Sequence, residues 1–90
     1  MSRIEQIQRA VERAAECPAK YLESVKVLEG FRDQIIWEGE VEVFALQGHS
    51  KAKRAYGWQS GDRFVAVLEI PPVDSANTAV RASIAAELQK

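Results

Sequence analysis

The residues best suited to chemistry lie in one stretch, residues 47–58, with the sequence QGHSKAKRAYGW. It contains the only histidine, His49, whose imidazole titrates near neutral pH and could serve as a general base. A general base needs an acidic partner and a pocket, and the loop places only Ser50 beside the ring. A His-Ser pair in a tight turn more often stabilises the turn, so we predict no catalytic residue here.

The same stretch carries the densest positive charge in the chain. Lysine and arginine contacts to phosphates drive nucleic-acid affinity, and aromatic rings nearby could stack on bases. The alternative is that these cations keep a hairpin soluble and balance the acidic side chains of the neighbouring strand. The candidate nucleic-acid contacts are His49, Lys51, Lys53 and Arg54.

A row of three carboxylates could receive a divalent cation. Glu38, Glu40 and Glu42 alternate along a predicted strand, roughly 6.5–7 Å apart on one face, but no oxygen-rich loop surrounds them. The lone Cys17 excludes an internal disulfide and a cysteine-rich zinc site, and it lies at the end of a helix, where it acts as a small hydrophobe. We therefore predict no metal and no cofactor.

Composition predicts one small globular domain, residues 1–90, with 47% hydrophobic and 28% charged residues. Twelve basic and thirteen acidic side chains give a net charge of −1, which argues against a general polyanion binder. The chain has no apolar core typical of a signal peptide and no run of membrane-spanning length. These patterns predict a cytoplasmic protein that does not contact membranes.

The elements that position these residues follow from periodicity. Apolar residues at helical spacing and a Ser2–Glu5 capping box predict a helix that ends before Pro18. From Ile35 the period changes to two, with the alternation running to Ala45, and further strands are predicted over 51–59 and 63–70. After two prolines, Asp74 or Ser75 caps a second helix.

The predicted fold is therefore α+β in the order α-β-β-β-α, a three-stranded antiparallel meander with both helices packed on one face. Residues 18–34 are read as a connection, which leaves open whether they form a strand or cover the outer sheet face with their apolar side chains. Those side chains are Tyr21, Leu22, Val25 and Phe31.

A predicted register places Val43 opposite Ala55, with Val41 and Val43 on the inner face. The outer face is then too apolar to be left in water. An internal segment could cover it, and so could a partner or a second copy of the chain. The predicted interaction residues on this face are Phe44, Arg54, Tyr56, Trp58, Val65 and Val67.

The helix–meander–helix order resembles that of the double-stranded-RNA-binding domain. In that family the loop between the first two strands carries a Gly-Pro-x-His element, and here Gly48-His49 lies in the corresponding loop without the proline. The resemblance implies RNA contact through this loop. It does not extend to the family's lysine cluster, because the last helix begins near Asp74 and offers only Arg81 and Lys90.

A second resemblance rests on WEGEVEVFALQGHSKAKRAYGW followed by RFVAVLEIPPVDS, which is similar to a small bacterial family of uncharacterised function. The sequence supplies no nucleophile–base pair, metal ligand set or phosphate-binding glycine loop. We therefore predict a non-enzymatic interaction module that uses the outer sheet face and the 47–54 hairpin, with a homodimer as one arrangement. The alternative is an RNA- or DNA-binding domain that uses the basic hairpin.

Overall fold

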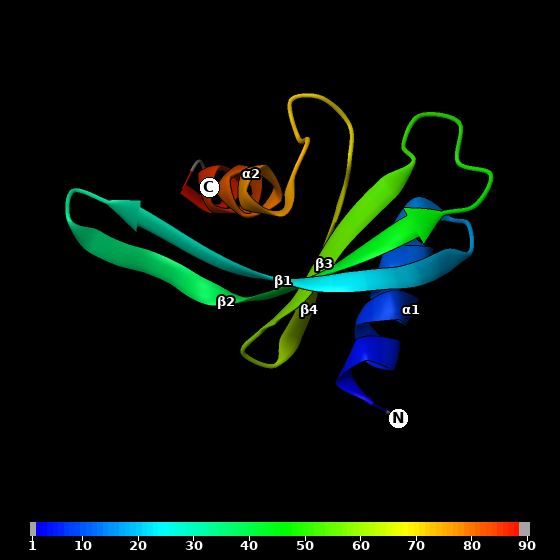
Figure 1. Ribbon diagram of the computed structural model, residues 1–90, viewed down its shortest axis with the longest axis horizontal. Coiled ribbons are helices and arrows are strands. Elements are labelled where there is room, and N and C mark those ends of the chain that lie inside the picture. The colour runs from blue at the N-terminus through cyan, green and yellow to red at the C-terminus, as the bar shows by residue number, and fades with distance from the viewer. Residues whose placement is uncertain (1, 89–90) are drawn as a thin grey trace.

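The computed structural model describes residues 2–88 and contains two helices and four strands (Figure 1). The elements in chain order are α1 (Arg3–Ala15), β1 (Ala19–Phe31), β2 (Gln34–Leu46), β3 (Arg54–Ser60), β4 (Arg63–Leu68) and α2 (Ala76–Leu88). The predicted α+β class and antiparallel meander are confirmed, but the sheet has four strands in the order β1-β2-β3-β4 where three were predicted.

The additional strand, β1, occupies most of the segment that was read as a connection. Its core-facing positions Val25, Val27 and Glu29 alternate with exposed ones, and the charged residue at the third position hides the apolar period of two. β1 pairs with β2 along a long hairpin that projects to one side of the molecule (Figure 1). Arg32 and Asp33, both with positive φ, form its turn, a geometry that suits the twist of two-residue hairpins.

The predicted register between β2 and β3 is wrong by one residue. Val43 pairs with Tyr56, and Phe44 pairs with Ala55. Because side chains alternate across a strand, this shift places the aromatic residues of β3 on the same face as Val43. The segment that joins the strands is longer than predicted, since β3 begins at Arg54.

The helices pack on opposite faces of the sheet, and not on one face as predicted. α2 covers Val43, Tyr56 and Trp58, whereas α1 covers Phe44 and Ala55, the residues next to them in sequence. Figure 1 shows α2 above the sheet and α1 behind it. In the observed register both faces are apolar, so each face buries the stripe of one helix.

Short-range hydrogen bonds cap the N-terminus of each helix. Ser2 and Glu5 form the predicted capping box, and Ser75 caps α2 by accepting the Thr78 N–H through its hydroxyl. Arg81 on α2 bonds to the buried carboxylate of Glu29 on β1, which fastens α2 to the long hairpin. Within residues 2–88, neither helix is long and apolar enough to cross a bilayer.

Candidate interaction site

The predicted outer face is buried inside the domain. Phe44 is 0% exposed beneath α1, and Tyr56 and Trp58 are 3% and 2% exposed beneath α2. Val65 and Val67 are partly buried against the same α2 cluster, so the predicted exposure is wrong for the apolar residues of this set. The helices cover these side chains, because the one-residue shift in register gives each face its own helix. Only Arg54 of the predicted set is exposed.

Tyr56 retains a polar contact within this core. Its hydroxyl bonds to the Glu69 carboxylate just beyond β4. Burial, together with this bond, raises the pKa of Tyr56 well above its ordinary value. The phenol therefore stays neutral and donates to Glu69 at physiological pH, a role that fixes the ring in the core.

The basic hairpin owes its shape to its histidine. His49 Nδ1 accepts the backbone N–H groups of Lys51 and Ala52 at 3.0 and 2.9 Å, so the ring proton lies on Nε2. Ala52 is buried against the α1 cluster, while Lys51 and Lys53 are exposed. The imidazole thus stabilises the turn, and the candidate cations project from it.

The three glutamates of the predicted row differ in burial. Glu38 and Glu40 are exposed, but Glu42 is fully buried on the α1 side. Its Oε2 accepts the Ser24 hydroxyl, whereas its Oε1 has no hydrogen-bond partner and lies 3.6 Å from the Arg3 guanidinium. In the part of the chain that the structure describes, no group of His, Cys, Asp or Glu side chains could hold a metal ion.

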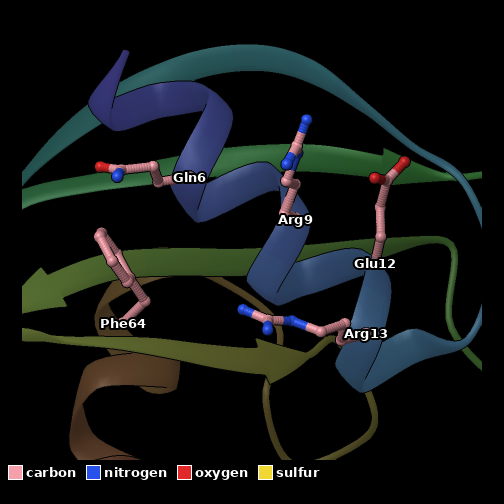
Figure 2. Close-up of a pocket in the computed structure, with 5 residues that line it drawn as sticks. All are labelled: Gln6, Arg9, Glu12, Arg13 and Phe64. Atoms are coloured by element: carbon pink, nitrogen blue, oxygen red, sulfur yellow. The ribbon is translucent and has the colours of Figure 1, made fainter. Parts of the chain in front are cut away.

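An open groove of about 610 Å³ lies between α1 and the start of β4 (Figure 2). The residues that line this α1–β4 groove are Gln6, Arg9, Glu12, Arg13 and Phe64. In Figure 2 the Arg13 guanidinium extends from α1 toward the side on which the Phe64 ring lies. The groove therefore combines an aromatic surface with cations.

The charge of the groove is not balanced internally. Arg9 and Arg13 lie four residues apart on one side of α1, and within residues 2–88 neither has a carboxylate at ion-pair distance. The Glu12 carboxylate accepts the backbone N–H of Ala19 at 3.0 Å. The groove thus presents two guanidinium groups to solvent or to a partner.

Next to the groove lies the edge of the sheet formed by β4. Across the described residues β4 pairs only with β3, and residues 64–68, FVAVL, contain no charge and no proline. Glu69 donates its backbone N–H to Arg54, so by alternation residues 65 and 67 also direct their backbone groups toward β3. The backbone N–H and C=O groups of Phe64 and Ala66 and the N–H of Leu68 therefore point away from the sheet, while the Leu68 C=O already accepts the Ile70 N–H at 2.9 Å.

Sequence reasoning did not find this β4 edge or the groove. The signal for the edge was present, because an uncharged run of five residues bounded by Arg63 and Glu69 is unusual for an edge strand. The groove had no comparable signal, since its lining comes from two segments that are distant in sequence.

No protein-family model matches the chain, and no curated protein and no solved structure is significantly similar to it.

Proposed function

We propose that this chain is a non-enzymatic interaction module and that its partner is a protein that docks on the β4 edge beside the α1–β4 groove. The single observation that carries the proposal is the outer edge of β4, which is uncharged over residues 64–68 and pairs with no other strand among the described residues. Natural proteins usually protect an edge strand with charge, proline, a bulge or a covering segment. The five residues at the centre of β4 include neither charge nor proline, which supports a role in pairing.

The chemistry of the site favours strand addition. An extended partner segment would bond to the outward backbone groups of β4, and its side chains would pack on Phe64 and Leu68. Arg13, whose guanidinium extends toward the Phe64 side, would favour acidic side chains at the rim of the contact. His49 is engaged in its own turn, so the proposal assigns it no catalytic role.

A photo-cross-linker tests this proposal. We expect a benzoylphenylalanine in place of Phe64 to form a covalent adduct with a protein in the cells that make this chain. The same group at Ile36, an exposed apolar position on the long hairpin, is the control and should form little adduct. No adduct from position 64, or equal adducts from both positions, would contradict docking at the β4 edge.

A second candidate function is binding to RNA or DNA through the basic hairpin. The observation in its favour is the exposure of Lys51, Lys53 and Arg54, which leaves their charges available to phosphates. The net charge of −1 limits such binding to this local cluster.

For the nucleic-acid candidate we expect duplex or single-stranded binding at low salt that weakens steeply as salt is raised. Lys51→Ala with Lys53→Ala should weaken binding and reduce the slope against log salt by about 2, because each phosphate contact contributes about 1. Lys20→Ala with Lys26→Ala, which removes the same charge from exposed positions on β1, should leave both quantities unchanged. If both double variants weaken binding equally, the chain attracts nucleic acid only through its overall positive charges, and the basic hairpin is not a binding site.

A further inference from the structure

We infer that the partner on the β4 edge is a second copy of this chain. The two β4 strands would pair antiparallel about a two-fold axis at Ala66 and join two four-stranded sheets into one. This inference rests on the proposed function, because it names the partner of the same edge. It is argued from the backbone register, the side chains on each face and the charges at the two ends of the strand.

The backbone permits few registers. A two-fold axis perpendicular to the sheet keeps each side chain on its own face, so paired residues must be separated by an even number of positions. Hydrogen-bonded pairs must also use the outward-facing residues Phe64, Ala66 and Leu68. Axes at Val65 and at Ala66 satisfy both conditions and pair residues 63–67 and 64–68 respectively, whereas an axis at Phe64, Val67 or Leu68 leaves half of the strand or more unpaired. The axis at Ala66 is the one that the side chains and charges favour, because the axis at Val65 would place Arg63 opposite Val67.

The side chains match in the same register. Phe64 meets Leu68 of the second copy on the α1 side, where both are already partly buried. Val65 meets Val67 on the α2 side, where both pack against the α2 cluster. Apolar cross-strand pairs of this kind stabilise antiparallel sheets.

The charges at the ends of the strand also match. In this register Arg63 lies opposite Glu69 of the second copy, and the symmetry repeats the pair at the other end. Opposite charges directly across an antiparallel pair stabilise it, and like charges in the same positions destabilise it. The apolar centre of β4 is thus flanked by opposite charges, which favours this orientation and register, although Glu69 also accepts the Tyr56 hydroxyl within its own copy.

The helices are compatible with this arrangement. Both copies of α1 would lie on one side of the joined sheet, near the α1–β4 grooves. α1 carries Glu5 and Glu12 as well as Arg9 and Arg13, so the two helices do not approach each other as purely positive surfaces.

Sedimentation of the purified chain over a wide concentration range tests the inference. We expect a monomer–dimer equilibrium. Ala66→Pro should raise the dimer dissociation constant at least about tenfold, because it removes an outward-facing N–H that has no role in the pairing with β3. Circular dichroism and the unfolding midpoint establish that this variant is folded. Lys26→Ala, an exposed change on the opposite edge strand, is the control and should leave the constant unchanged.

Charge exchange tests the register itself. Arg63→Glu and Glu69→Lys should each weaken self-association, and a mixture of the two variants should form a heterodimer of restored affinity. Because Glu69 also accepts the Tyr56 hydroxyl, Glu69→Gln, which removes the charge and keeps an acceptor oxygen, is measured beside Glu69→Lys, and the unfolding midpoint of each variant establishes that it is folded. A chain that stays monomeric throughout, or a dimer insensitive to these changes, overturns the inference. If position 64 still cross-links to a different protein, only the identity of the partner is wrong. If it cross-links to nothing, the proposed function fails as well.

Discussion

Replacing Gly57 with alanine is expected to lower the free energy of unfolding by about 1–3 kcal/mol, the usual range for overpacking a core, and valine should lower it further. A Cβ atom at this position would lie 2.5 Å from Ile7 Cγ2 and 3.0 Å from Val11 Cγ2. Both neighbours are fully buried and β-branched, so their side chains have few other rotamers to adopt. The close approach of α1 to β3 thus depends on glycine.

A double-mutant cycle with Ile7→Ala measures this contact. Urea unfolding of both single variants and the double variant should show that Gly57→Ala is much less damaging once the Ile7 methyl groups are gone. Gln59→Ala, an exposed change on the same strand, is the control and should stay within about 0.5 kcal/mol of the parent. Strictly additive effects at Gly57 and Ile7 would contradict the steric explanation.

Arg3→Ala is expected to lower the free energy of unfolding by about 1–3 kcal/mol, less than the 3–5 kcal/mol typical of breaking a fully buried ion pair. Glu42 is 0% exposed, whereas Arg3 is 49% exposed, so water replaces part of the lost interaction. Without the guanidinium, the buried Glu42 carboxylate keeps only its bond from Ser24.

If Arg3 stabilises the fold by compensating the buried Glu42 carboxylate, the loss of unfolding free energy in Arg3→Ala must depend on the charge of Glu42. In a Glu42→Gln background, Arg3→Ala should therefore have little effect on the urea midpoint. Glu40→Gln serves as the control, because Glu40 lies 3.9 Å from the same guanidinium but is exposed. If Arg3→Ala is equally damaging with glutamine at position 42, Arg3 stabilises α1 by another route.

The parts of the fold that could be predicted from the sequence are those fixed by neighbouring residues. The capping box at Ser2 and Glu5 and the cap at Ser75 both act within one helical turn. Helical spacing predicts a buried stripe of Ile4, Ile7, Val11 and Ala14 on α1; Ile7 and Val11 are buried and Ile4 is partly buried, whereas Ala14 is exposed. Such signals do not depend on the rest of the chain, so α1 and the start of α2 were predicted correctly.

The register between β2 and β3 depends on distant contacts, which explains the error there. The prediction assumed that only one face of the sheet was buried. On that assumption, a shift of the β2–β3 register by one residue would bury Glu42 at a prohibitive cost in free energy. The structure buries Glu42 and compensates it with Ser24 and Arg3. Nothing local to β2 indicates that a residue 39 positions earlier supplies the counter-charge.

The candidate site was missed for the same reason. The predicted surface depended on Tyr56 and Trp58 lying outside, and one step of register placed both beneath α2. The α1–β4 groove requires knowing that α1 lies beside Phe64, which only the tertiary arrangement provides. Of the predicted residues, His49 was correctly placed in the turn, which it stabilises through short-range hydrogen bonds, whereas Lys51 and Lys53 lie in the loop and not on the predicted strand.

Val43 and Phe44 are consecutive, yet one belongs to the packing unit of α2 and the other to that of α1. The central strands β2 and β3 therefore separate two hydrophobic core clusters, one on each face of the sheet. A substitution that changes side-chain volume in one cluster shifts the backbone of these strands, and the side chains of the other cluster must then repack. A change in the packing beneath α1 is therefore expected to alter the packing beneath α2, although the two helices lie on opposite faces of the sheet.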